Sequence, residues 1–593
     1  MKKKIALMLL LFAGQFSMLL QAQTIYVNAG SVLASDSNDG DDPCLPWETL
    51  NARQWQDGMV LEVAPGVYTV NAVASPKSIT INGMGDNPSD VIIQGLNPVE
   101  YAEGTMNIAN FSMFKFHNTN TVNLTMKNLT VQNISTNANG AAFYLFANST
   151  LNLDSVVVKK AKTTGGRSGG AIYNNGGTLN ASNTLFEECY AAIAGAVFAA
   201  PGSKNTFTNC RFINNGNLEA LTNGSCYGGA ISMNESAEVN INACYFKENK
   251  TEHGVNASTQ AILQGTGGAI YIRCGTNTTT KLSISNSTFY RNQSEGASSV
   301  LHVTVGTSGN SDQDFLAFDL TLTNNTFLEN KGNTSANKNT NTIEFFASAK
   351  VRGNFLSVNN TFLNNNNPDY PAARSIWLPN TKLQATLINN IFLDGDNTIQ
   401  ADNSVTNRPP IIARGNVISK PAGSINATND PELYATENYN RLNETNASVL
   451  LATALTEPAA GVPYLALQAG SSAIDNGIDA YTVNEVNVVP ALDVRGQATV
   501  NKKDAGAYEF KQETTGIDHP EDETVLTLTP NPFKDAVVLP RTVDKIDFFD
   551  VSGRNLLSVS RPGATVYTGN LPKGVYLVVV SFENKSVTVK LVK

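Results

Sequence analysis

The sequence has little charge and few residues that bind metals or move protons. Of its 593 residues, 15% are charged and only four are histidines. The net charge of −9 is spread without a basic stripe, which argues against nucleic acid, because phosphates require clustered Lys and Arg. The histidines His117, His253, His302 and His519 are scattered and give little support to a histidine triad or metal site.

Long apolar runs are also missing, except at the N-terminus. There, lysines at positions 2–4 precede an apolar run over residues 5–20, and Ala22 offers a small residue for cleavage. This pattern predicts a secretory signal peptide over residues 1–22. No later segment is comparably apolar, so we expect a secreted mature protein that starts near Gln23 and has no transmembrane segment.

Cysteine is scarce, and its spacing excludes common metal and redox motifs. None of the six cysteines forms a C-x-x-C pair, which argues against a zinc or redox site. Two interpretations stay open: buried structural thiols, or up to three disulfides in an oxidising compartment. The residues concerned are Cys44, Cys189, Cys210, Cys226, Cys244 and Cys274.

What the sequence has in abundance is a short repeat ending in phenylalanine and asparagine. Each copy follows a stretch of alternating apolar and polar residues, such as 282–285, which indicates a strand. The gaps between copies are irregular, so connections of variable length must leave a constant unit. The repeated aromatic positions are Phe186, Phe212, Phe246, Phe289, Phe327, Phe362 and Phe392.

A second motif, Gly-Gly-Ala-Ile or a close variant, recurs between these copies at residues 169–172, 228–231 and 267–270. Its glycines allow tight or positive-φ backbone before a strand. A unit of this size cannot bury its apolar face alone, so neighbours must stack. We therefore predict an all-β chain with a parallel β-helix of about a dozen coils, in which Phe stacks inside and Asn forms a hydrogen-bonded ladder. A β-sandwich array is the less favoured alternative.

The paired motifs resemble the repeats of polymorphic outer membrane proteins and, more broadly, pectate-lyase-like right-handed β-helices. Residues 36–50 and 63–68 are similar to the N-terminal cap of many secreted β-helices. The resemblance covers residues 24–510 and implies the fold strongly but the chemistry weakly. We expect the β-helix with its cap over residues 23–421.

Residues 422–510 are expected to end the helix and cap it. Segments 472–477, 492–496 and 504–509 look like the terminal module of bacterial β-helix surface proteins, although Thr499 stands near where that family often has a second arginine. Two interpretations are possible, of which the second is favoured: a functional site, or a polar staple of the cap. The residues in question are Asp475, Asp493, Arg495 and Asp504.

A linker over residues 511–523 precedes a small module at 524–593. Its short alternating strands, about seven of them, fit an immunoglobulin-like β-sandwich. Pro530-Asn531-Pro532, the turn at 550–554 and the strand at 574–576 resemble the C-terminal sorting domain of the type IX secretion system. The resemblance implies handling by that machinery through residues 524–593, removal of the tail, and a protein that is outer-membrane-bound or released.

The sequence offers few candidate catalytic groups. A lyase needs a base beside charge-neutralising groups, and a hydrolase needs two carboxylates with room for water. The basic candidates are Lys159, Lys160, Lys162 and Arg167, and the acidic ones are Asp312, Asp314, Asp319, Glu187, Glu188, Glu248, Glu329 and Glu344. A loop at 36–42 could hold Ca²⁺ through Asp36, Asp39 and Asp41, although a plain turn is favoured.

Because no compact acid, base and metal constellation is visible, we favour a non-enzymatic adhesin or glycan-binding surface protein. Its contacts with extracellular glycans or a host surface would come from the long face and the loops at 216–226, 250–266 and 331–341. The alternative is a polysaccharide lyase or glycoside hydrolase with a groove on the helix.

Overall fold

The computed structural model describes residues 22–50, 52–70, 72–74, 76–95, 111–217, 226–252, 254–255, 262–263, 265–275, 278–305, 316–332, 341–346, 351–365, 374–378, 382–401, 408–511, 528–539, 542–582 and 585–593. The chain divides into two compact units, residues 1–511 and 512–593. Apart from residue 22, the expected signal peptide lies outside the described residues, as does the expected linker after residue 511.

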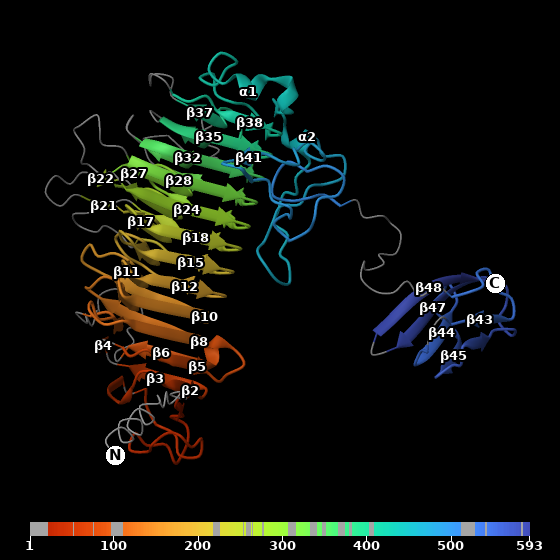
Figure 1. Ribbon diagram of the computed structural model, residues 1–593, viewed down its shortest axis with the longest axis horizontal. Helices are drawn as coiled ribbons and strands as arrows, with labels where there is room; N and C mark the ends of the chain where they lie inside the picture. Colours follow the sequence, from red (N-terminus) through yellow and green to blue (C-terminus); the bar gives the residue numbers. More distant parts are fainter. Residues whose placement is uncertain are drawn as a thin grey trace, which may run out of the picture. The chain divides into compact units, whose positions relative to one another are not determined.

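The larger unit is a parallel β-helix, which confirms the predicted fold class (Figure 1). Its 24-stranded sheet holds two stacks of strands, joined at each coil by a tight bend. The first column contains β1 (Thr24–Val27), β2 (Val60–Val63), β5 (Thr80–Gly83), β8 (Val122–Thr136), β10 (Ser149–Thr163), β12 (Thr178–Ser182), β15 (Lys204–Thr208), β18 (Glu238–Asn242), β24 (Thr279–Ser285), β28 (Leu316–Thr323), β32 (Val351–Val358), β35 (Lys382–Ile388) and β38 (Ile412–Arg414). The second column contains β3 (Gly66–Val70), β6 (Val91–Gly95), the later parts of β8 and β10, β13 (Leu185–Glu187), β16 (Arg211–Ile213), β19 (Tyr245–Lys247), β25 (Thr288–Tyr290), β29 (Thr326–Leu328), β33 (Thr361–Leu363), β36 (Ile391–Leu393), β39 (Val417–Ile418) and β40 (Arg441–Leu442).

A separate 11-stranded parallel sheet closes the coil. It contains β4 (Val73–Ala74), β7 (Phe114–Lys115), β9 (Phe143–Phe146), β11 (Ile172–Asn175), β14 (Val197–Ala199), β17 (Ile231–Asn234), β23 (Ile270–Cys274), β27 (Leu301–Val305), β31 (Asn341–Phe346), β34 (Arg374–Leu378) and β37 (Ile399–Ala401). Short pairings lie beside it: β20 (Lys250–Thr251), β26 (Gln293–Ser294) and β30 (Lys331–Gly332), and the hairpin of β21 (Gly254–Val255) with β22 (Ile262–Leu263).

The repeated phenylalanines stack inside the coil, as predicted. Phe186, Phe212 and Phe246 are register partners on successive coils, and the same pairing continues to Phe392. Neighbouring ring centroids lie 4.3 to 5.0 Å apart, with the rings stacked. Their faces therefore contact copies of themselves, which favours one register over a slipped one.

The predicted asparagine ladder is also present at the bend after the second column. Each buried side-chain Nδ2 donates to the Oδ1 of the next coil at 2.7 to 3.1 Å. A second ladder, which the sequence did not single out, runs at the bend between the two columns. The first ladder contains Asn215, Asn249, Asn292, Asn330, Asn365 and Asp394, and the second contains Asn325, Asn360, Asn390, Asn416 and Asn440.

The cysteines of the β-helix are free thiols in the structure, which favours the structural interpretation. Cys44 is exposed, while the other five are buried. Cys210 and Cys244 stand one above the other in line with the second ladder, where the Cys210 amide donates to the Cys244 sulfur at 3.3 Å. Burial raises the pKa of Cys189 to about 12, so this thiol is uncharged at neutral pH.

The segment after β40 folds back over the outside of the second column (Figure 1). It carries the helices α1 (Pro431–Tyr434) and α2 (Asn446–Val449) and the hairpin of β41 (Thr482–Val483) with β42 (Val486–Asn487). Its Leu465 and Ala505 join a core with Leu363 of β33. The described part of this unit also contains 3₁₀ turns at Ala52–Gln54, Pro88–Asp90 and Thr436–Asn438.

The smaller unit has its own apolar core and two antiparallel sheets, consistent with the predicted sandwich. Where about seven strands were expected, six are described, because Thr529 forms only an isolated bridge to Val538. The strands are β43 (Ala536–Val538), β44 (Lys545–Phe549), β45 (Asn555–Ser560), β46 (Thr565–Tyr567), β47 (Val575–Phe582) and β48 (Lys585–Val592). Among the described helices, none is both long and apolar enough to span a bilayer.

Candidate functional site

The outer face of the 11-stranded sheet carries one continuous line of aromatic and hydrogen-bonding side chains. In each strand the preceding apolar residue, such as Ile172 or Leu301, points into the core, so the next one points outward. The strand register aligns these outward residues from coil to coil. We call them the outer ladder: Lys115, Tyr144, Tyr173, Phe198, Ser232, Tyr271, His302, Glu344, Trp377 and Gln400.

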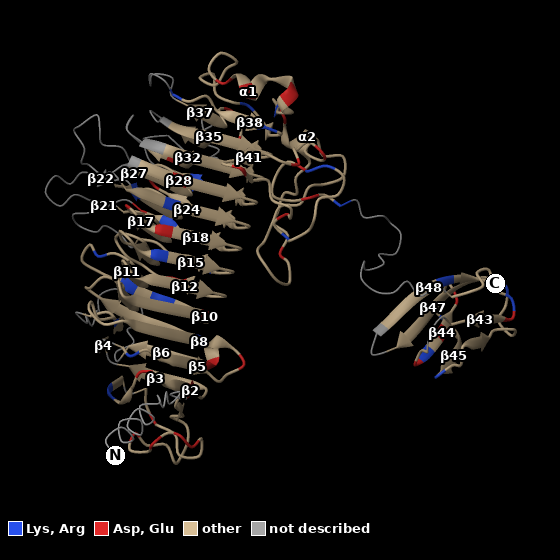
Figure 2. Cartoon of the chain, in the orientation of Figure 1, with Lys and Arg blue, Asp and Glu red and all other residues tan. Residues whose placement is uncertain are grey.

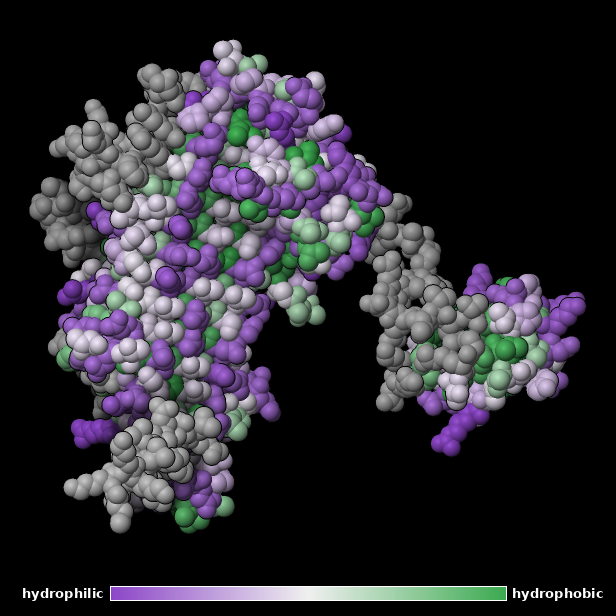
Figure 3. Space-filling view, viewed as in Figure 1, coloured by the Kyte–Doolittle hydropathy of each residue, from purple (hydrophilic) through white to green (hydrophobic). Residues whose placement is uncertain are grey.

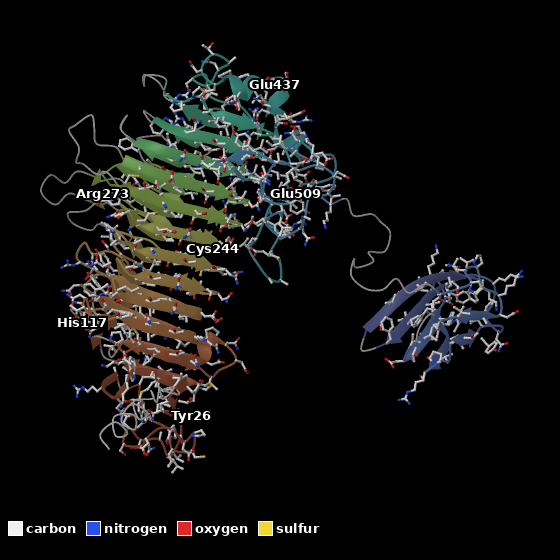
Figure 4. All side chains as sticks on the ribbon, viewed as in Figure 1. Tyr26, His117, Cys244, Arg273, Glu437 and Glu509 are labelled. Carbon is white, nitrogen blue, oxygen red and sulfur yellow. The ribbon has the colours of Figure 1, made fainter. Side chains whose placement is uncertain are left out.

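The segments that connect to the strands of this sheet also vary in length. The bend between the two columns stays short from coil to coil, whereas long segments precede or follow strands of the 11-stranded sheet, including 217–226, 306–315 and 366–373. In Figure 4, His117 and Arg273 lie on this flank of the helix, away from buried Cys244.

The outer ladder is open at its ends and covered in its middle. Tyr144, Tyr173, Trp377 and Gln400 are half-buried. Between them, Tyr271 is stacked against Tyr227 at a centroid distance of 4.3 Å. A ligand can therefore reach the first coils and the last coils of the ladder directly.

The open end near the N-terminus combines rings, a cation and an amide. Tyr144 and Tyr173 stack at 5.0 Å, and Lys115 Nζ lies 5.7 Å from the Tyr144 centroid. Since the ring faces cover one another, the edges and hydroxyls are what the stack presents outward. Asn175 Nδ2 donates to the Tyr144 hydroxyl at 3.5 Å.

The covered middle holds a cluster of polar groups around Glu344. Ser298 Oγ donates to Glu344 Oε2 at 3.1 Å, and Asn341 Nδ2 donates to the same oxygen at 3.0 Å. His302 Nδ1 lies 4.0 Å from that oxygen. Arg374 Nη1 donates to Asn341 Oδ1 at 3.2 Å, and its guanidinium lies 5.2 Å from the Trp377 ring.

Burial controls the charge of this cluster. It raises the pKa of Glu344 to about 7, although the hydrogen bonds from Asn341 and Ser298 act in the opposite direction. Burial also lowers the pKa of His302 to about 3, so the imidazole is neutral at physiological pH. The contact between His302 and Glu344 is therefore not an ion pair, despite its short distance. A carboxyl that keeps its proton near neutral pH can serve as a proton donor.

The cluster does not form a serine–histidine–acid triad. A triad requires the nucleophile at one ring nitrogen and the carboxylate at the other. Here both Ser298 Oγ, at 3.3 Å, and Glu344 Oε2 face the same nitrogen, Nδ1 of His302. Of the five predicted glutamates, only Glu344 lies on the outer ladder.

The other glutamate and lysine candidates lie along the second column and its bends. Glu188, Glu248, Glu329 and Lys160 all have positive φ near 50°, which marks a left-handed bend position. Lys159 is the register partner of Glu187 on the second column, away from the outer ladder. The structure therefore does not bring these groups together as a catalytic constellation.

The remaining lyase candidates are also dispersed. Arg167 Nε donates to the Asn137 carbonyl at 2.8 Å, and Asp319 accepts from Asn354 on the outside of the first column at 3.0 Å. Lys162 forms an isolated bridge with Tyr190 at the edge of the coil. Asp312 and Asp314 lie outside the described residues, as do parts of the predicted contact loops.

The calcium candidates lie in the N-terminal cap. Asp36 Oδ1 accepts from the amides of Glu48 and Thr49 at 3.1 and 2.8 Å, so its carboxylate holds the loop together. Asp39 and Asp41 lie in the same loop. Across the described part of the chain, no group of three or more His, Cys, Asp or Glu side chains could hold a metal ion. Calcium binding at this loop stays a prediction.

The acidic candidates of the C-terminal segment, Asp475, Asp493 and Asp504, make contacts within that segment. Asp493 pairs with Arg495 at 2.7 Å, and Arg495 lies 3.7 Å from the Tyr508 ring centroid. Asp504 accepts from the amides of Asp475, at 2.8 Å, and Phe510. These contacts favour the staple interpretation. Figure 4 shows Glu509 in the same segment, where it pairs with buried Lys503 at 2.8 Å.

The outer ladder was missed because its residues differ from coil to coil. A usable signal was nonetheless present in the Gly-Gly-Ala-Ile motif. The residue after its Ile or Val is Tyr173, Phe198, Ser232 or Tyr271, and each is an outward position.

Comparison with known proteins identifies the tail. A family described as the secretion system C-terminal sorting domain matches residues 527–593. The type IX sorting domain predicted from the sequence is therefore confirmed. The protein is therefore exported, either to the cell surface or into the medium.

The β-helix is similar in shape to several solved structures. The Azotobacter vinelandii mannuronan C-5 epimerase AlgE6 A-module is 11% identical, with 63% of this chain and 87% of that one covered and a TM-score of 0.28. The PL6 family alginate lyase AlyGC is 11% identical, with 74% and 58% covered and a TM-score of 0.29. The catalytic domain of a GH87 alpha-1,3-glucanase is 11% identical, with 65% and 64% covered and a TM-score of 0.28. No curated protein matches the chain.

The class of protein is thus defined by two parts: a parallel β-helix and a sorting tail for export.

Proposed function

We propose that the exported β-helix binds a glycan at the open ends of its outer ladder. The observation that carries this proposal is the coil-to-coil register of outward, half-buried Tyr, Trp, Gln and Lys side chains on one sheet. Neighbouring coils are about 4.8 Å apart, so the ladder repeats its hydrogen-bonding groups at a spacing suited to a linear polymer. Aromatic side chains beside a few polar groups are typical of small-ligand and sugar sites.

The charge distribution supports a neutral or weakly charged polymer as the ligand. Figure 2 shows the strands of the β-helix largely without charged residues, and Figure 3 shows that the face carrying the first column is largely hydrophilic. Such a surface favours hydrogen bonding over the counterion release that dominates nucleic-acid binding. Export through the sorting tail would place it where extracellular glycans occur, and removal of the tail afterwards is part of this proposal.

Glycan-array binding of the exported protein tests the proposal, with Tyr144→Ala/Tyr173→Ala as the variant. Loss of two aromatic contacts should weaken binding by at least about tenfold, since each contributes on the order of 1 kcal/mol or more. Thr206→Ala, an exposed change on the first column, is the matched control and should bind like the native protein. Undiminished binding by the double variant, or no glycan bound by the native protein, would refute the assignment.

A second candidate, a polysaccharide lyase or hydrolase, rests on Glu344 alone. Its pKa of about 7 suits a proton donor. A lyase should release unsaturated, ultraviolet-absorbing products from uronate polymers, and a hydrolase should release reducing ends. If either activity appears and Glu344→Gln abolishes it while glycan binding persists, the enzyme candidate replaces simple binding.

A further inference from the structure

A pocket lies on a different surface, between the second column and the C-terminal segment. It is lined by Asn183, Thr184, Leu185, Asn209, Arg211 and the loop 459–461, and its volume is about 350 Å³. Small-molecule sites span roughly 300 to 1,000 Å³, so this pocket fits one small ligand rather than a polymer.

The C-terminal segment creates this pocket by covering only part of the second column. Outward Thr288 of β25 and Thr361 of β33 lie beneath the segment, where they bond to the Pro463 carbonyl and the Ala507 amide. In the same column, outward Leu185 of β13 and Arg211 of β16 are not fully covered. The loop 459–461 therefore overhangs these two coils.

The pocket contains a cation without an ion-pair partner among the described residues. Arg211 is exposed, and its guanidinium lies 5.8 Å from the ring of buried Tyr245 on the next coil. Stacking against a ring orients the planar guanidinium without occupying its donors. These donors suit a carboxylate, which they can bind in a bidentate manner.

One wall of the pocket is a row of hydrogen-bonded asparagine side chains, which is polar but uncharged. Asn183 Nδ2 donates to Asp154 at 2.9 Å, and Asn209 Nδ2 donates to Asn183 Oδ1 at 2.7 Å. The next bend position holds Ala243, which has no amide to continue the ladder. Asn209 Oδ1 thus has no donor from the coil beyond it and can accept from a hydroxyl group.

We infer that this pocket binds the carboxylate-bearing end residue of an acidic glycan, with Arg211 on the carboxylate and Asn209 on a ring hydroxyl. Leu185 and the alanines of the loop 459–461 form the apolar wall, which suits the C–H face of a sugar ring. The site is separate from the outer ladder, so it does not depend on the function proposed above.

The test is calorimetric titration of the full chain with D-glucuronate and D-galacturonate, and with D-glucose and acetate as comparisons. A uronate should bind, while D-glucose and acetate should bind at least about tenfold more weakly, because each lacks half of the contacts. Arg211→Ala should weaken uronate binding by at least about tenfold, and Asn209→Ala by a smaller factor.

Two controls keep the result interpretable. Lys281→Ala removes a cation from the outside of the first column and should leave uronate affinity unchanged, as should Tyr144→Ala/Tyr173→Ala on the outer ladder. Arg211 is exposed, so its replacement should not alter the melting temperature. Failure of both uronates to bind, equal binding of D-glucose, or unchanged affinity in Arg211→Ala would overturn the inference.

Discussion

The inside and the outside of the same coil follow opposite rules. On the inside, Phe289 contacts Phe246 below and Phe327 above, so each position repeats the chemistry of its neighbours. On the outer ladder, Tyr271, His302 and Glu344 follow one another without repetition. The stacked interior side chains contact equivalent side chains of the neighbouring coils. The outward side chains instead contact solvent, covering segments and any ligand. A side chain that is repeated from coil to coil therefore indicates a role in stability, whereas one that differs from its neighbours indicates a role in recognition.

The largest expected effect compares the same substitution on the two sides. Phe289→Ala should lower the free energy of unfolding by about 3–5 kcal/mol, because it leaves a cavity in a closed stack. Phe346→Ala, at a side chain that is 59% exposed, should cost less than about 1 kcal/mol. Urea unfolding of both variants measures the difference. Equal costs would show that the interior stack is not a special source of stability.

A smaller effect concerns pH and the covered part of the outer ladder. The folded-state pKa of Glu344 is about 7, above its usual value of 4.5, so the folded protein binds the extra proton between these values. This group alone should therefore make stability fall by about 2–4 kcal/mol as pH rises from about 4.5 to about 7, whereas buried His302, with a pKa lowered to about 3, acts in the opposite direction below about pH 6.5.

Glu344→Gln isolates this contribution, because Asp504, with a pKa also raised to about 7 by burial, contributes in the same direction. In denaturant titrations at several pH values, the stability difference between the native protein and the variant should shift against the native protein as pH rises from about 4.5 to about 7. Identical slopes would mean that Glu344 is solvated and ordinarily ionised.

The smallest expected effect compares two asparagines. Asn330 donates to the Phe289 carbonyl and to Asn365 Oδ1 inside the coil, so Asn330→Ala should cost about 1–3 kcal/mol. Exposed Asn354 makes one outer contact with Asp319, so Asn354→Ala should cost less than about 0.5 kcal/mol. The thermal unfolding midpoints of the two variants measure this difference. A larger decrease in the midpoint for Asn354→Ala than for Asn330→Ala would contradict the role of the ladder.

Much of the fold could be predicted because its signals are local. The Phe and Asn positions follow alternating strands, and left-handed bends such as Asn209 and Asn286 suit asparagine. The sorting tail could also be predicted from local sequence motifs between Pro530 and Lys593. By contrast, the sequence showed His302 and Glu344 only as separate candidates 42 residues apart, and the structure places them as register partners on adjacent strands.

The sequence alone determined the coil, its internal Phe and Asn stacks and the export tail, because strand alternation and bend chemistry act over a few residues. Only the tertiary structure decided which outward side chains meet and where the C-terminal segment leaves a pocket beside Arg211. Those outcomes depend on the register between coils, which is set across connections of unequal length, and on contacts such as that of Thr361 with Ala507.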